Sequence, residues 1–150
     1  MIVFRLTKTK YAKDLSGKGA GKAGGRWNSK GVAMLYTSES RALCVTEIAV
    51  HTPLGIIPDN YQLISIELPD SAVLSVDLSE LLKGWNSLPS IASVKHIGDN
   101  FINENKYLVL KVPSAVVQGD FNYLINPEHP DFDRVKIIKM EAFNFDARLF

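Results

Sequence analysis

The sequence predicts a single α+β domain over residues 1–150, with a mixed or mostly antiparallel central sheet flanked by helices. With 150 residues, 46% of them hydrophobic, the chain can bury one substantial core but is too short for two ordinary domains. Short apolar or alternating runs, typical of strands, recur along its whole length. Strand and helix patterns do not alternate regularly, which argues against a doubly wound parallel sheet.

In the first half of the chain, strands are expected over 2–6 and 33–37, separated by a glycine-rich loop over 11–25. A helix is expected to follow and to run to about His51. Ser38 or Ser40 is its expected N-cap, because a serine side chain accepts a hydrogen bond from the first turn, and Pro53 lies just beyond its end.

In the second half, residues 62–68 alternate apolar and polar side chains, as a half-buried strand does. Further strands are expected over 72–76, 107–112, 122–125 and 135–139, and a short helix over 78–82. Pro89 is expected to open a longer helix that the polar segment 100–106 ends. Its apolar face contains Ile91, Val94, Ile97 and Phe101.

The charge balance excludes a strong attraction to nucleic acid or anionic membranes across the whole molecule. Seventeen basic and sixteen acidic residues leave a formal charge of +1, so an anionic ligand must be bound locally. The single cysteine, Cys44, cannot form an internal disulfide. The opening residues lack the apolar run of a signal peptide, and no stretch approaches the roughly 20 apolar residues of a membrane span. A cytoplasmic location is expected.

The segment YAKDLSGKGAGKAGG over 11–25 is the first candidate for binding phosphate, since it combines five glycines with Lys13, Lys18 and Lys22. It does not match GxxxxGK[ST], and no strand-to-helix dinucleotide fingerprint accompanies its GxGxG spacing. Such a loop is more often a mobile surface connection. Arg26 directly follows it, and a guanidinium can hold a pyrophosphate bidentately while Trp27 anchors the chain beside it.

Glu47 is the most informative single residue, because it shares a helix face with Leu43 and Val50. A carboxylate on an apolar face costs free energy unless it has a partner or a function. Either an ion pair with Arg26 or Arg41 or a catalytic role explains it, and the sequence does not decide between them. Tyr36, just before this helix, either belongs to the core or stacks on a planar heterocycle.

A second polar cluster lies in VPSAVVQGDFNYLINPEHPDF, which contains Ser114, Asn122, Asn126 and His129. The Asn-Pro and His-Pro pairs indicate turns. Ser114 lacks the GxSxG context of a nucleophilic serine. His51 and His129 have no metal-binding spacing, so no metal site is expected.

Together, GGRWNSKGVAMLYTSESRALCVTEIAVH and the VPSAVVQGDFNYLINPEHPDF segment resemble the RES domain, the toxin of a bacterial toxin–antitoxin pair. The string GRWN, the following Tyr-Thr, the helix glutamate, the Pro-Ser pair and the NxxxNP-H-P string occur in the family's order, and the resemblance covers nearly the whole chain. The arginine, glutamate and serine that name the family correspond to Arg26, Glu47 and Ser114.

This resemblance implies a fold similar to ADP-ribosyltransferases and an enzyme that depletes NAD by splitting nicotinamide from ribose, without a metal or cofactor. Glu47 would stabilise the oxocarbenium-like ribose. Arg26, helped by Arg5, would hold the pyrophosphate. The implied roles of the remaining residues are stacking on nicotinamide for Tyr36, a hydrogen bond to the nicotinamide amide or its ribose for Ser114, and orientation of the loop for Asn126.

The resemblance also implies an antitoxin partner with an Xre-like DNA-binding part that covers the cleft. The toxin itself has no basic helix suited to a DNA groove, so no direct nucleic-acid contact is expected. Whether the complex contains a toxin dimer is not decided by the sequence. Three activities remain to be separated: hydrolysis of NAD, which we place first, ADP-ribosyl transfer to a macromolecule, and nucleotide binding without catalysis.

Overall fold

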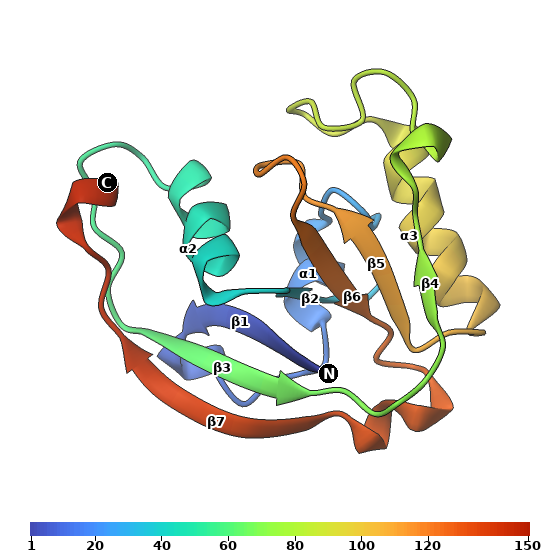
Figure 1. Ribbon diagram of the computed structural model, residues 1–150, viewed down its shortest axis with the longest axis horizontal. Coiled ribbons are helices and arrows are strands. Elements are labelled where there is room, and N and C mark those ends of the chain that lie inside the picture. The colour runs from blue at the N-terminus through green and yellow to red at the C-terminus, as the bar shows by residue number, and fades with distance from the viewer.

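Seven strands form one mixed sheet in the order β4-β5-β6-β2-β1-β3-β7 (Figure 1). The computed structural model describes residues 1–150. Neighbouring strands pair antiparallel, apart from β4 and β5, which are parallel. The expected α+β fold with a mostly antiparallel sheet is therefore confirmed. The strands are β1 (Ile2–Lys8), β2 (Leu35–Ser38), β3 (Tyr61–Glu67), β4 (Val73–Ser75), β5 (Val109–Pro113), β6 (Phe121–Ile125) and β7 (Lys136–Phe143).

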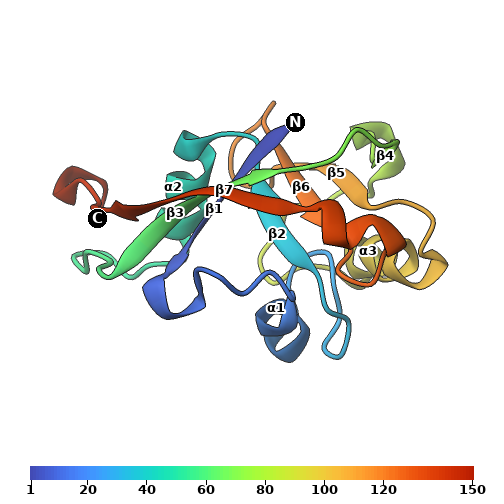
Figure 2. The same cartoon turned by 90° about the horizontal axis from the view of Figure 1, so that it is seen from below.

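Three α-helices flank the sheet: α1 (Lys18–Ala23), α2 (Arg41–Val50) and α3 (Ala92–Glu104). In Figure 1, α2 stands above β1, and α3 stands beside β4 and β5 at the other end of the molecule. Figure 2 shows α1 below β2. Four short 3-10 turns, η1 (Thr9–Tyr11), η2 (Leu78–Glu80), η3 (Pro130–Arg134) and η4 (Ala147–Leu149), complete the fold. No helix is both long and apolar enough to cross a membrane.

The start of α2 agrees with the sequence prediction. Ser40 is its N-cap in an extended conformation, and the Ser40 side chain accepts a hydrogen bond of 3.1 Å from the backbone N–H of Leu43. The helix ends at Val50, one residue before His51. Because this cap fixes where the helix begins, it also fixes the direction in which Glu47 points.

The prediction of an irregular loop over the whole of 11–25 was wrong, since Lys18–Ala23 form α1. Glycine lowers helix propensity, but here tertiary contacts outweigh it. Gly17 and Gly24 adopt positive φ at the two ends of the helix, a conformation that glycine adopts without strain. The buried side chain of Asn28 donates to the Ala20 carbonyl at 2.8 Å and ties α1 to the following loop.

The apolar face predicted for α3 is confirmed, but the helix bounds are not. Val94 and Phe101 are buried, and Ile91 and Ile97 pack against the same cluster. The helix begins at Ala92 rather than at Pro89 and continues to Glu104, where Asn105 turns the backbone into the left-handed region. The polar residues after position 100 therefore do not end the helix: Asn103 and Glu104 lie on its exposed face, while Phe101 and Ile102 are buried. Strand bounds also shift, with β2 starting at Leu35, β5 at Val109 and β7 reaching Phe143.

Two of the buried clusters lie under different helices. Phe101 and Val94 of α3 pack on Leu110 and Leu124 of the sheet, together with Trp27. Under α2, a smaller cluster is formed by Leu6, Cys44 and Leu63. Helices α2 and α3 are anchored to different parts of the sheet, and the larger of the two cavities described below has walls from both of them.

Two buried hydroxyls on the sheet give a direct test of hydrogen-bond energetics. Ser65 on β3 is 4% exposed, and its hydroxyl has no hydrogen-bond partner. Thr37 on β2 is 3% exposed and donates to the Tyr123 carbonyl at 2.6 Å. An unpaired buried hydroxyl is costly, whereas a paired one contributes about 1 kcal/mol. Ser65→Ala is expected to leave the free energy of unfolding unchanged or raise it by up to ~1 kcal/mol.

Thr37→Val is the matched variant, and it is expected to lower the free energy of unfolding by about 1–3 kcal/mol because the Tyr123 carbonyl loses its donor. Urea unfolding followed by circular dichroism measures both. A loss of stability in Ser65→Ala as large as that in Thr37→Val would show that the Ser65 hydroxyl is satisfied in solution.

Candidate active site

Two adjoining cavities open where β2, β6 and α2 meet. The larger has a volume of about 830 Å³ and the smaller about 230 Å³. The walls of both include Tyr36, Glu47 and Asn122. The larger volume lies in the range of about 300–1,000 Å³ that is typical of small-molecule sites. A ligand that occupies both cavities must therefore pass these three side chains.

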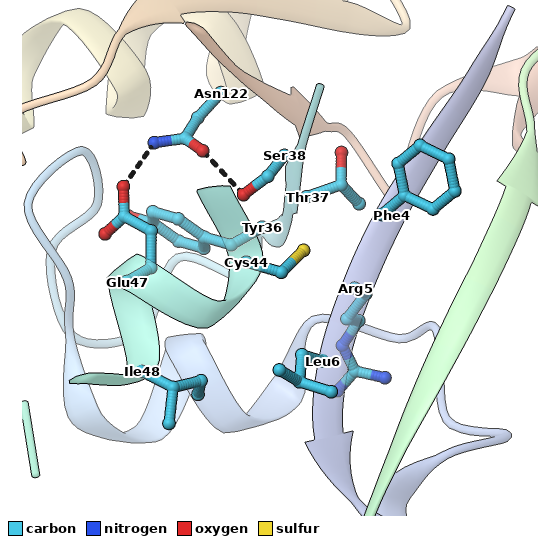
Figure 3. Close-up of a pocket in the computed structure, with 10 residues that line it drawn as sticks. All are labelled: Phe4, Arg5, Leu6, Tyr36, Thr37, Ser38, Cys44, Glu47, Ile48 and Asn122. Atoms are coloured by element: carbon cyan, nitrogen blue, oxygen red, sulfur yellow. Dashed lines mark hydrogen bonds between the residues drawn. The ribbon is translucent and has the colours of Figure 1, made fainter. Parts of the chain in front are cut away.

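Glu47 has one carboxylate oxygen fixed by the protein and one that is free. Its Oε1 accepts hydrogen bonds from the Asn122 amide at 2.9 Å and from the Ser114 hydroxyl at 3.2 Å. Oε2 has no hydrogen-bond partner. Figure 3 shows the Asn122 contact and the second oxygen turned away from it. The carboxylate is thus held in one orientation with an oxygen available to a ligand.

The predicted alternative of an ion pair for Glu47 is not what the structure contains, since no arginine or lysine lies within 4 Å of its carboxylate. The predicted apolar face of α2 around Glu47 is confirmed only in part. Leu43 is buried, whereas Val50 is 54% exposed. Val50 lines the larger cavity together with Glu47.

Asn122 is a site residue that our sequence analysis did not place in the site. It lies opposite Ser38 in the β2–β6 register, and the Ser38 hydroxyl donates to its Oδ1 at 2.8 Å. Because a carboxylate only accepts, the contact with Glu47 fixes which end of the amide is the NH₂ group, and this leaves Oδ1 to accept from Ser38 (Figure 3). Only the strand register brings Asn122 to Glu47, and the sequence did not reveal that register.

Ser114 lies behind Glu47 rather than on a cavity wall. Its hydroxyl oxygen accepts hydrogen bonds from the backbone N–H groups of Val116 and Val117 at 3.1 and 3.0 Å, and its hydroxyl proton is donated to Glu47. The side chain is buried. With its donor and acceptor capacity used in this way, Ser114 is placed to hold the carboxylate and the turn that follows β5.

Arg26 lines the larger cavity, with its guanidinium anchored at one end. Its Nη1 donates to the backbone carbonyls of Trp85 and Ser87 at 3.0 and 2.8 Å. Nε and Nη2 form no hydrogen bond with the protein, so the Nε–Nη2 edge of the guanidinium group is available to an anion. Partial burial lowers the pKa of Arg26, and the charge of Glu47 opposes that shift. An arginine remains charged in either case.

The Tyr36 ring lines both cavities, and its hydroxyl holds the Arg26 segment in place. The hydroxyl donates to Asn28 Oδ1 at 2.6 Å and accepts from the backbone N–H of Trp27 at 3.0 Å. Burial raises the pKa of Tyr36, so the hydroxyl stays neutral. A Cβ on Gly25 would lie 2.6 Å from the Tyr36 hydroxyl oxygen, so only glycine fits there.

The smaller cavity contains Arg5 and Cys44. Arg5 donates to the carbonyls of Tyr11 and Asp14 at 3.2 and 3.1 Å, and burial lowers its pKa while Asp14 opposes the shift. Burial raises the pKa of the Cys44 thiol to about 11, so the thiol is neutral. Arg5 therefore organises the segment after β1 and reaches the second cavity, not the one that holds Arg26.

Asn126 and His129 lie outside both cavities. Asn126 is fully buried, donates to Asn105 Oδ1 at 2.8 Å and accepts from the backbone N–H of Glu128 at 2.9 Å. His129 caps η3 by accepting from the backbone N–H of Asp131. No group of three or more His, Cys, Asp or Glu side chains is arranged to hold a metal ion. The structure thus brings Glu47, Ser114, Tyr36 and Arg26 around one site and leaves Asn126 apart from it.

Comparison with known proteins identifies the family. The RES domain model matches residues 2–147. The chain is 38% identical over 145 residues to the Prs ADP-ribosylating toxin of Sphingobium, covering 95% of this chain and 90% of the relative. It is 37% identical over 154 residues to a Toxin Res of Pseudomonas putida, covering the whole of both chains.

A solved structure has the same fold. It is a chain from the M. tuberculosis MbcT–MbcA toxin–antitoxin complex, with a TM-score of 0.71 and 21% identity, and the match covers 95% of this chain and 84% of that chain. The family model spans nearly all of the sequence, and four curated relatives exceed 30% identity over at least 95% of it. The chain therefore belongs to the RES-domain family, the family of these toxins.

Proposed function

We propose that this chain is the toxin of a bacterial toxin–antitoxin pair and that it depletes NAD by hydrolysing the bond between nicotinamide and ribose. One observation carries the proposal: the Glu47 carboxylate, clamped through Oε1, lines the same 830 Å³ cavity as the open edge of Arg26. A fixed negative charge and a fixed anion-binding group in one cavity suit a substrate with a cationic reacting centre and an anionic pyrophosphate.

In the proposed reaction, the C1′–N bond of NAD breaks and its electron pair moves to the pyridinium nitrogen, so nicotinamide leaves as a neutral molecule. The ribose becomes oxocarbenium-like, and the free oxygen of Glu47 stabilises that positive charge. Water then adds to C1′ and loses a proton. The products are nicotinamide, ADP-ribose and one proton. The reaction requires no metal or cofactor.

The other site residues bind and orient the substrate in this proposal. Arg26 holds the pyrophosphate through Nε and Nη2, and the Tyr36 ring stacks on nicotinamide. Ser114 acts on the reaction by holding Glu47, instead of contacting nicotinamide as the sequence analysis expected. Asn122 shares that positioning role. Arg5 shapes the smaller cavity, and Asn126 supports the turn after β6.

The second candidate is ADP-ribosyl transfer to a macromolecule, which is favoured by the name of the Sphingobium relative, an ADP-ribosylating toxin. Both reactions share the first bond cleavage, so the same site supports either. They differ only in whether water or a side chain of a target protein attacks C1′.

The test is to incubate the purified, partner-free chain with NAD labelled in its adenylate part, with and without bacterial lysate. Nicotinamide and ADP-ribose are followed by chromatography, and label on protein by gel. Hydrolysis predicts equal amounts of both products without lysate and at unchanged rate with EDTA. Label retained on protein, with nicotinamide released only when lysate is present, would replace hydrolysis by transfer. Binding of NAD with no release under either condition would leave a non-catalytic binding module.

We also propose an antitoxin partner that covers the cavities, of the DNA-binding, Xre-like type, and a cytoplasmic site of action. The support is the match to a toxin chain solved with its antitoxin. Apolar side chains at the rim of the larger cavity fit such a contact, since Leu88 is 81% and Val50 54% exposed.

A further inference from the structure

We propose that Lys95, on α3, is a second pyrophosphate-binding residue that acts together with Arg26. This inference rests on the proposed function, because it assigns a substrate contact within the same site. The lysines of the glycine-rich segment, Lys13, Lys18 and Lys22, were the cations that the sequence suggested for binding phosphate. All three are exposed and none lines either cavity, whereas Lys95 lines the larger one.

The fold fixes the Lys95 ammonium next to Arg26. Its Nζ donates to the backbone carbonyl of Gly25, the residue that directly precedes Arg26. Helix α3 is tied to the same loop one turn later, where Asp99 accepts from the backbone N–H and the hydroxyl of Ser29 at 2.9 and 2.6 Å. Lys95 is half-buried, so its charge acts in a less polar environment than a surface lysine does.

The charges that line the larger cavity show why a second cation is needed. Its walls contain one arginine, one glutamate and one lysine, which are Arg26, Glu47 and Lys95. The charges of Arg26 and Glu47 cancel, so of these three groups Lys95 supplies the net positive charge. A pyrophosphate carries two negative charges. Without Lys95, the charges of Arg26 and Glu47 would leave the cavity wall with no net positive charge to offset the free energy of removing the pyrophosphate from water.

The available donors also match two phosphate groups. An ammonium has three N–H donors, and the protein uses one of those on Lys95 for Gly25. Arg26 uses Nη1 for two carbonyls and leaves Nε and Nη2. Each cation can therefore donate two hydrogen bonds to an anion without giving up its contact with the protein. We assign one phosphate of the pyrophosphate to each.

The experiment compares Lys95→Met, which keeps the length of the apolar stem, with Lys22→Met, an exposed lysine of α1 that lines neither cavity. Steady-state NAD cleavage gives kcat and KM, and calorimetry gives the affinity for ADP-ribose. Lys95→Met is expected to raise KM and to weaken ADP-ribose binding by about 10-fold or more, with kcat changed less than about threefold, as loss of a charge-assisted contact in uniform binding predicts. Lys95→Arg is expected to restore most of the affinity, and Lys22→Met to behave as the wild type.

A purely structural role for Lys95 predicts a different pattern, in which the melting temperature falls and KM does not rise. If Lys95→Met does not fold, Lys95→Gln retains N–H donors on a polar side chain that is one bond shorter and removes the charge, and the same rise in KM is expected. Unchanged KM and ADP-ribose affinity in a folded variant, beside an active wild type, would overturn the assignment of Lys95. An inactive wild type that still binds ADP-ribose in a Lys95-dependent way would refute the proposed reaction and leave this binding site standing.

Discussion

Glu47→Gln is expected to lower NAD turnover about 100-fold or more while leaving NAD affinity nearly unchanged, as the loss of a group that acts in the transition state does. Glutamine has the same shape, and its amide oxygen can still accept the hydrogen bonds from Asn122 and Ser114. In the proposed reaction, what the variant loses is the negative charge next to the forming oxocarbenium. The measurement is nicotinamide release, together with NAD binding by calorimetry.

Glu104→Gln is the matched control, because this exposed glutamate at the end of α3 lines neither cavity. It removes the same charge from the molecule and is expected to leave kcat and KM unchanged. Turnover in Glu47→Gln within about threefold of the wild type would remove Glu47 from the mechanism. A loss of NAD binding in parallel with turnover would instead assign Glu47 to ground-state binding.

Those parts of the fold that depend on local pattern could be predicted from the sequence. The Ser40 cap defines α2, and the spacing of Val94, Ile97 and Phe101 defines the inner face of α3. Helix α1 could not be predicted, since its glycines disfavour a helix and contacts with the following loop hold it, among them those of Asn28 with Ala20 and of Gly31 with Gly21. Such contacts join α1 to the loop that follows it, and helix propensity, which depends on local sequence, does not include them.

The sequence singled out Arg26 and Glu47 as candidates, through residue type and the family resemblance, and both line the larger cavity. The sequence does not contain the pairing that brings Asn122 opposite Ser38, nor the packing that brings Lys95 of α3 onto the Gly25 carbonyl. Strand register and helix placement decide both. The same holds for Ser114, since only the folded chain brings its hydroxyl into contact with Glu47, Val116 and Val117.

The close approach of α3 to the Arg26 segment leads to the largest expected effect on stability. A Cβ added at Gly98 would lie 1.6 Å from the carbonyl oxygen of Trp27 and 2.7 Å from its carbonyl carbon. Both atoms belong to the backbone, so no side-chain rotation can relieve the clash, and α3 must move away from the loop. Overpacking a core typically costs about 1–3 kcal/mol and occasionally more. Gly98→Ala is expected to lower the free energy of unfolding by about 3 kcal/mol or more.

Gly19→Ala is the matched variant for this prediction, since it adds the same methyl group to a helical glycine that has no atom within 4 Å of the new Cβ. It is expected to raise the free energy of unfolding by about 0.5–1 kcal/mol through better helix propensity. Thermal melts should therefore shift in opposite directions, down by about 6–12 °C for Gly98→Ala. An unchanged melt in Gly98→Ala would mean that α3 does not lie against Trp27 in solution. The same displacement would draw Lys95 away from Gly25, so under the proposed role of Lys95 the variant should also weaken ADP-ribose binding.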